Sequence, residues 1–238
     1  MASLKNKTVF VAGGAGSVGE GIVRSLLQAG AKVFTISRHQ EKLEALRGYL
    51  GDLAGDRLVT FTGSLGDFDS AEAVKHEILS QQDQLDAVVA SLGSTWKGGV
   101  PITQLSMEDW QQYLFTNLTT HFVCARTFLP LLEKLQDSSY TFLGGAAAEV
   151  VTPNYALVSI PAAAQLMMAK VAMAELKDSP IRINEVMVNS LVKTRNSAEQ
   201  AQPHWITADE VGDYVAWLIS DEAHMVRSSV PYLQKQVR

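Results

Sequence analysis

The sequence predicts an α/β fold in which a doubly wound parallel sheet of about seven strands carries helices on both faces. Short apolar runs alternate with longer helical patterns along the whole chain, and such alternation is typical of parallel strands joined by right-handed helical crossovers. The strand segments are apolar at successive positions, as in Thr8–Ala12 and Ala87–Ser91. Unbroken apolar strands indicate a sheet that is buried on both faces.

The expected elements follow one another without an internal repeat or a linker, so residues 1–238 are expected to form one domain. Strands are predicted over Thr8–Ala12, Lys32–Ser37, Leu58–Thr62, Ala87–Ser91, Tyr140–Leu143, Ile181–Val188 and Val230–Leu233. Helices are predicted over Gly19–Ala29, Gln40–Leu50, Ser70–Gln81, Ser106–Leu135, Ala162–Leu176 and Thr207–Ser220. The long helix over Ser106–Leu135 is expected to break before Trp110.

Composition excludes several classes of partner. The formal net charge is -5, whereas nucleic acids and anionic membrane surfaces need a basic face, so neither is expected to bind. No apolar run is expected to approach the length that spans a bilayer. Cys124 is the only cysteine, which rules out an internal disulfide and fits a cytoplasmic location. The five histidines show no metal-ligand spacing, so no metal site is expected.

The first apolar run opens into a glycine-rich turn that leads into the first helix. Residues 12–19 read Ala-Gly-Gly-Ala-Gly-Ser-Val-Gly, which contains both GxGxxG and GxxGxxG. A pyrophosphate needs a tight turn, close approach of the backbone, and the free N–H groups of a helix N-terminus. The segment therefore predicts a Rossmann-type dinucleotide site formed by Gly13, Gly14, Gly16, Ser17, Val18 and Gly19.

The end of the second strand indicates which dinucleotide binds. An acidic residue at this point hydrogen-bonds the adenosine ribose and favours NAD(H), but the chain has Ser37 and Arg38. A hydroxyl and a guanidinium suit a 2′-phosphate, so NADP(H) is the expected cofactor in preference to NAD(H). The alternative is that Arg38 is a solvated residue at the start of a helix.

Further segments make the chain resemble the short-chain dehydrogenase/reductase family over nearly its whole length. Residues 86–93 lie where the family has a strand ending in Asn-Asn-Ala-Gly, and Asn117 matches a helix-borne asparagine. Residues 181–184 and 217–223 are also similar to family segments. The resemblance implies an oxidoreductase, with a short substrate lid over residues 190–206. It also implies cofactor contacts at Ser64, Leu65, Ser91 and Gly93.

The family's catalytic pattern is not matched. Its members use Tyr-x-x-x-Lys with a serine about thirteen residues earlier, because a phenol alone is a poor base at neutral pH. One register uses Tyr155 as the tyrosine and leaves Ser159 at the lysine position. The lysine is therefore missing in this register, as it is in the second register described next.

A second register counts back from Ala174-Glu175-Leu176, which resembles a family segment. It puts Gly145, Val158 and Ala162 at the serine, tyrosine and lysine positions, and it is preferred because it satisfies two spacings. Asn117 is then the remaining member of the family's catalytic set. Asn117 and Tyr155 are therefore the catalytic candidates, with Tyr155 more simply interpreted as structural. His121, one turn after Asn117, is expected to be packed rather than to act as an acid or base.

Three functions follow from this combination of features. The first is an NADP(H)-binding oxidoreductase of unknown substrate with an atypical active site. The second is a catalytically silent NADP(H)-binding sensor or scaffold, and the third is a non-redox enzyme that reuses the cleft. In relatives, the helix that holds Asn117 and the one that holds Met167 form a four-helix interface, so a homodimer or homotetramer is expected. The alternative is that these apolar residues lie in an intramolecular core.

Overall fold

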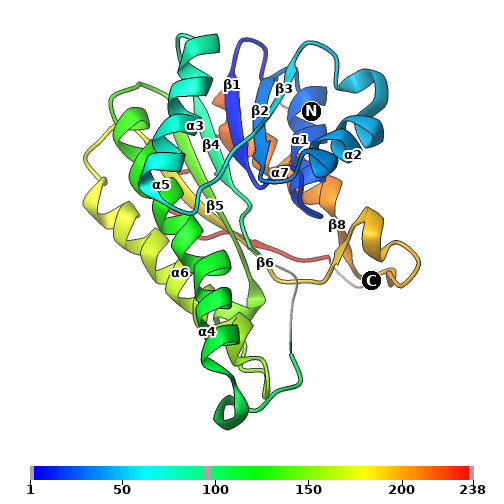
Figure 1. Ribbon diagram of the computed structural model, residues 1–238. Helices are drawn as coiled ribbons and strands as arrows, with labels where there is room; N and C mark the ends of the chain where they lie inside the picture. The colour runs from blue at the N-terminus through cyan, green and yellow to red at the C-terminus, as the bar shows by residue number, and fades with distance from the viewer. Residues whose placement is uncertain (1–2, 94–97, 236–238) are drawn as a thin grey trace.

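A parallel sheet with helices on both faces dominates the computed structural model, which describes residues 3–93 and 98–235 (Figure 1). The main sheet has seven strands in the order β3-β2-β1-β4-β5-β6-β9, and every pairing is parallel. The strands are β1 Thr8–Ala12, β2 Lys32–Ser37, β3 Leu58–Thr62, β4 Ala87–Ala90, β5 Ser139–Gly145, β6 Arg182–Val188 and β9 Tyr232–Leu233. This order confirms the expected doubly wound sheet. It reverses between β1 and β4, where such sheets bind ligands.

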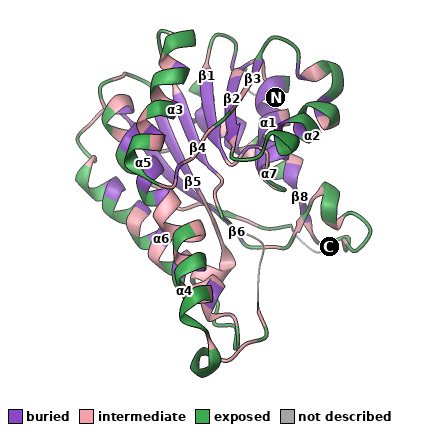
Figure 2. Cartoon of the chain, in the orientation of Figure 1, coloured by how far each residue is buried: buried purple, intermediate pink, exposed green. Residues whose placement is uncertain are grey.

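The helices form two layers, one on each face of the sheet (Figure 1). One layer contains α1 Gly19–Gln28, α2 Gln40–Leu50 and α7 Ala208–Ile219. The other contains α3 Phe68–Gln81, α5 Thr120–Leu132 and α6 Ala156–Glu175. Successive residues of β1 face opposite layers, since Val9 and Val11 belong to the first core and Phe10 and Ala12 to the second. The strands are accordingly buried on both faces, as Figure 2 shows.

The long predicted helix is interrupted, but not before Trp110 as expected. Helix α4 spans Met107–Leu114 and includes Trp110, because the Ser106 hydroxyl caps it by accepting the Asp109 amide at 3.0 Å. A π-helical segment, Phe115–Thr119, then joins α4 to α5. Helix α6 begins at Ala156 rather than Ala162, and Pro161 lies inside it.

Shorter elements connect the main ones. Strands β7 Val192–Lys193 and β8 Ile206–Thr207 pair in parallel outside the main sheet and enclose residues 194–205. The single-turn 3-10 helices are Gly51–Leu53, Ile102–Gln104, Ala146–Ala148, Arg195–Ser197 and Asp221–Ala223. The β7–β8 pair therefore joins the two ends of the segment that is expected to be the lid.

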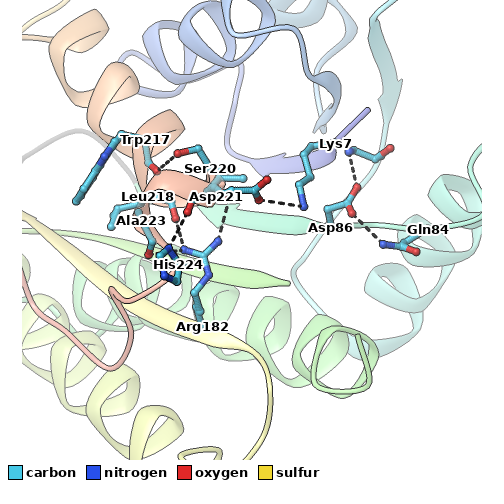
Figure 3. A network of polar contacts seen from close by, with 12 residues as sticks. Lys7, Gln84, Asp86, Arg182, Trp217, Leu218, Ser220, Asp221, Ala223 and His224 are labelled. Atoms are coloured by element: carbon cyan, nitrogen blue, oxygen red, sulfur yellow. Dashed lines mark hydrogen bonds and ion pairs between the residues drawn. The ribbon is translucent and has the colours of Figure 1, made fainter. Parts of the chain in front are cut away.

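Arg182 joins the start of β6 to the end of α7 (Figure 3). Its buried guanidinium donates hydrogen bonds to the carbonyls of Leu218, Ile219 at 3.0 Å and Ala223 at 3.1 Å. These carbonyls lie at a helix C-terminus, where backbone acceptors lack partners within the helix and a cation is favourable. The contact fixes the amino edge of the sheet, opposite the edge at which ligands bind.

Helix α6 is long and apolar enough, by length and composition, to cross a membrane. The expectation that no apolar run approaches that length is therefore wrong for residues 156–175. In the fold, α6 packs against β5 and β6, and its buried residues include Leu157, Leu166 and Met173. Core helices of soluble proteins pass the same length and hydropathy test.

Candidate functional site

The glycine turn between β1 and α1 leaves no room for side chains at two positions. Gly13 has φ +86° and lies against the Ser91 carbonyl, so a Cβ atom at residue 13 would overlap that carbonyl. A Cβ atom at Gly19 would overlap the Gly13 carbonyl and lie 2.8 Å from the Gly14 Cα. The backbone of the turn is therefore packed on itself and on the end of β4, as close approach to a ligand requires.

The turn also presents donors for an anion. Helix α1 begins at Gly19, and its N-cap residue Val18 provides no side-chain cap. The backbone amides of Ser17 and Val18 have no hydrogen-bond acceptor in the part of the chain that is described. Amides at a helix N-terminus, together with the helix dipole, favour a bound phosphate.

Ser37 and Arg38 lie at the end of β2, next to this turn in the sheet. The Ser37 hydroxyl accepts a hydrogen bond from the His39 amide at 3.1 Å, which leaves its proton available for donation. The Arg38 side chain is exposed, and its guanidinium has no ion pair or hydrogen bond with any other described residue. The Ser37 hydroxyl and the Arg38 guanidinium are therefore both available to bind an anion from solution.

The other predicted cofactor contacts lie at the ends of β3 and β4. The Ser64 hydroxyl accepts the Gly66 amide at 3.0 Å, and Leu65 is buried. The Ser91 amide donates to the Ala12 carbonyl at 2.9 Å, which continues the pairing of β4 with β1. Gly93 has φ +143°, and the Asn117 Oδ1 atom lies 2.9 Å from the place of a Cβ atom there. The structure thus brings Gly93 and Asn117 together.

Asn117 lies in the π-helical segment between α4 and α5. Its side-chain amide donates to the Tyr113 carbonyl at 2.9 Å and contacts the Thr116 hydroxyl at 3.1 Å. Single π-helical turns occur frequently at functional sites because they redirect one side chain out of the helical pattern. Here the turn directs Asn117 toward the end of β4.

His121 is packed rather than presented to the cleft. Its side chain is buried, its Nε2 atom lies 3.2 Å from the Leu92 carbonyl oxygen, and its ring stacks on Phe142. Burial lowers the pKa of His121 to about 4, so the imidazole is neutral at physiological pH. This agrees with the expectation of a packed histidine.

The positions assigned to the family's serine, tyrosine and lysine carry no ionisable group. Gly145 ends β5, and the nearest atom to a Cβ there is the Val188 carbonyl oxygen at 3.9 Å, so a larger residue has space. Val158 and Ala162 lie one turn apart on α6. Tyr155 immediately precedes α6, and its ring packs against Gly98. The Tyr155 ring therefore packs between the loop that contains Gly98 and the loop that leads into α6.

Sequence reasoning missed a buried carboxyl group beside these positions. Glu185 of β6 is fully buried, and its carboxyl lies against Gly144 and close to Gln165 of α6. Burial raises the pKa of Glu185 to about 7, although Lys170 and Gln165 favour the ionised form. The available signal was an acidic residue within the otherwise apolar second half of β6.

A second missed pair lies at the edge of the same region. The Tyr232 hydroxyl of β9 donates to the Glu149 carboxylate at 2.9 and 3.0 Å. This hydrogen bond and the negative charge of Glu149 raise the pKa of Tyr232. The two residues are far apart in the sequence, so no local pattern indicates the pair.

The expected lid segment is tied to the glycine turn and to α1. The Asn196 side-chain amide lies 3.3 Å from the Ser17 hydroxyl, and Arg195 forms an ion pair of 2.9 Å with Glu20. Sequence reasoning missed both contacts because they join residues more than half the chain apart. Among residues 3–93 and 98–235, no group of three potential metal ligands occurs.

Comparisons with known proteins agree with this architecture. A family model described as short chain dehydrogenase matches residues 7–204. The chain is 24% identical to the oxidoreductase asL5 of Sarocladium schorii, over 95% of this chain and 93% of that protein. It is 27% identical to the 2,3-dihydro-2,3-dihydroxybenzoate dehydrogenase of Bacillus subtilis, over 83% and 77%.

Solved structures show the same fold at low sequence identity. A short-chain dehydrogenase/reductase from Mycobacterium ulcerans superimposes with a TM-score of 0.88 at 20% identity, covering 97% of this chain and 89% of that one. A dehydrogenase/reductase from Sinorhizobium meliloti gives 0.84 at 24% identity, covering 97% and 94%. The chain therefore belongs to the short-chain dehydrogenase family, whose members are oxidoreductases that bind a nicotinamide cofactor.

Proposed function

We propose that the chain binds NADP(H) at the glycine turn and acts as an oxidoreductase with an atypical active site. The observation that carries the proposal is the turn itself, in which Gly13 and Gly19 admit no Cβ atom and the Ser17 and Val18 amides are free to donate. Residues with these properties fit a pyrophosphate. Ser37 and Arg38, at the neighbouring strand end, suit the 2′-phosphate of NADP(H).

Calorimetric titration with NADPH and NADH tests the cofactor preference. Arg38→Ala is expected to weaken NADPH binding about 10-fold or more, because a hydrogen bond to a charged group contributes about 1.5–3 kcal/mol. NADH binding is expected to stay unchanged, since NADH has no 2′-phosphate. Equal or tighter binding of NADH than of NADPH by the unaltered protein would contradict the preference.

The altered active site restricts the reaction. When bound, a nicotinamide dinucleotide supplies or accepts a hydride. Reduction of a simple carbonyl also needs a proton, and a positioned general acid contributes typically about 10²–10⁴-fold. Val158 and Ala162 provide no such proton, while Asn117 can orient a polar group by hydrogen bonding. We therefore propose conjugated acceptors, such as quinones or enones, whose delocalised anion after hydride addition takes its proton from water, or substrates that bring their own proton relay.

Oxidation of NADPH, followed at 340 nm against panels of quinones, enones and simple carbonyls, tests this proposal. Turnover of conjugated acceptors with little turnover of simple ketones is the expected result. Fast reduction of simple ketones would contradict the interpretation of Val158 and Ala162.

A catalytically silent NADP(H)-binding sensor or scaffold is the second candidate. It is favoured by one observation, that Gly145, Val158 and Ala162 together offer no group that can transfer a proton. Tight NADPH binding with no turnover across the whole panel would select this function over the first.

We also propose that the chain forms a homodimer or homotetramer through α4, α5 and α6. Exposed apolar side chains occur on these helices and on the segment between them, namely Met107, Phe115, Phe122, Ile160, Met167 and Val171. The elements that carry them pack on one another, and exposed apolar side chains gathered on adjoining elements favour an interaction surface. A monomer by light scattering at micromolar concentration would contradict this proposal.

A further inference from the structure

We propose that the segment 190–206 acts as a clamp on the pyrophosphate of the dinucleotide, with Asn196 as a binding residue and Arg195 as the residue that fastens it. The inference rests on the proposed binding of NADP(H) at the glycine turn. It gives this segment a role at the phosphates in addition to the expected role of a substrate lid.

The first support is the contact of Asn196 with the glycine turn. The Asn196 side-chain amide lies 3.3 Å from the Ser17 hydroxyl. Ser17 also carries one of the backbone amides that remain without an acceptor among the described residues. A side-chain amide has two N–H donors, so Asn196 can keep its contact with Ser17 and still donate to a phosphate oxygen.

The second support is an ion pair between the adjacent residue and α1. The Arg195 Nη2 atom lies 2.9 Å from the Glu20 Oε2 atom, and its guanidinium lies 5.1 Å from the centre of the Tyr49 ring. Glu20 is buried, in the first turn of α1. Burial raises the pKa of Glu20, and Arg195 is the main group that opposes the shift. A buried carboxylate needs such a partner, so removing Arg195 leaves an uncompensated charge.

The third support is the rigidity of the segment between these contacts. The Thr194 amide donates to the Ser197 hydroxyl at 2.9 Å, and that hydroxyl contacts the Val192 carbonyl at 3.1 Å. Strands β7 and β8 close the base of the segment. Arg195 and Asn196 are therefore held in one short turn, and their partners Glu20 and Ser17 lie three residues apart, about one turn, at the start of α1.

Two roles of Glu20 can be distinguished: an effect of its negative charge on the bound anion, and an effect through its ion pair with Arg195. Asp209 of α7 also raises the pKa of Glu20, and it is paired with Arg24 at 2.6 Å. If Glu20 acted only through its charge, Glu20→Gln would tighten the binding of an anion. If Glu20 acts as the anchor of Arg195, the same substitution loosens the segment and weakens binding.

Calorimetric titration of NADPH tests the clamp with single-site variants. Asn196→Ala, Arg195→Met and Glu20→Gln are each expected to raise the dissociation constant about 3- to 10-fold, the range for loss of one hydrogen bond. The double variant Arg195→Met with Glu20→Gln is expected to bind no more weakly than the worse single variant, because both remove one contact. Gln200→Ala, an exposed position of the same segment, is the matched control and is expected to change nothing.

Two further measurements separate this inference from the proposed function. Adenosine 2′-monophosphate lacks the pyrophosphate, so its binding is expected to respond to Arg38→Ala and not to Asn196→Ala. Amide hydrogen exchange of residues 192–198, measured without ligand, is expected to accelerate in Glu20→Gln and Arg195→Met.

The outcomes divide clearly. Absence of NADPH binding by the unaltered protein would overturn both proposals. Normal binding by all three variants, or tighter binding by Glu20→Gln, would overturn the clamp and leave NADP(H) binding in place.

Discussion

Two glycine-containing segments at the ligand edge of the sheet differ in what their glycines do. At the β1–α1 turn, a Cβ atom on Gly13 or Gly19 would overlap backbone atoms. At the end of β5, a Cβ atom on Gly145 would have its nearest neighbour at 3.9 Å. Backbone packing therefore requires glycine at the turn, whereas at residue 145 it does not. Backbone packing thus constrains the proposed phosphate end of the site, whereas the β5–α6 end has space for the side chains that the family pattern places there.

The largest expected effect comes from breaking the constrained segment. Gly13→Ala forces a side chain onto the Ser91 carbonyl at φ +86°, and we expect NADPH binding to become undetectable by calorimetry. Strain and overlap are also expected to lower the free energy of unfolding by about 1–3 kcal/mol each. Gly48→Ala on α2, where a Cβ atom meets nothing within 4 Å, is the control and is expected to stabilise by about 0.5–1 kcal/mol. Normal NADPH binding by Gly13→Ala would contradict the geometry of the turn.

The second prediction introduces the family's catalytic side chains at the positions proposed for them. The triple variant Gly145→Ser, Val158→Tyr, Ala162→Lys is expected to gain ketone reduction with NADPH by about 100-fold or more, the typical contribution of a positioned acid. Each single variant is expected to gain little, because the phenol needs the ammonium to lower its pKa. A folded triple variant that binds NADPH and shows no gain would contradict the assignment of these three positions.

The third effect, which concerns stability rather than activity, comes from the buried carboxyl of Glu185 beside the β5–α6 end. The pKa of Glu185 is raised from 4.5 to about 7, so its contribution to stability is complete below about pH 4.5 and is lost as the pH rises through about 7. We expect the free energy of unfolding to fall by up to about 3 kcal/mol between these limits.

Glu185→Gln is expected to remove most of that pH dependence, as measured by denaturant unfolding from pH 5 to pH 8. Glu175→Gln, which removes an exposed carboxyl at the end of α6 that does not contribute to the shift at Glu185, is the matched control and should keep the dependence of the unaltered chain. An unchanged pH profile in Glu185→Gln would show that another group is responsible.

Much of the fold was predictable because apolar periodicity and glycine placement are local signals. Strands β1, β2 and β3 have the predicted bounds. The start of α6 was predicted too late, at Ala162 rather than Ala156, and the helix continues through Pro161. The π-helical segment at Phe115–Thr119 was also missed, because the sequence there remains a good helical pattern, and the segment packs on α6, which is distant in the sequence.

The candidate site was predictable only where one continuous segment forms it. The glycine turn and Ser37–Arg38 each lie in a single stretch that has its own chemical signature. The contacts of Arg195 with Glu20 and of Tyr232 with Glu149 join distant segments. Such pairs can be predicted only when the three-dimensional arrangement of these segments is known.

The contact of Glu185 with Gly144 also couples substitutions at these two positions. A Cβ atom at residue 144 would overlap the Glu185 carboxyl and lie 2.8 Å from the Met187 sulfur. Both atoms lie toward the ends of flexible side chains, so a side chain at 144 requires Glu185 and Met187 to adopt other rotamers. Engineering of this strand therefore has to treat residues 144, 185 and 187 together.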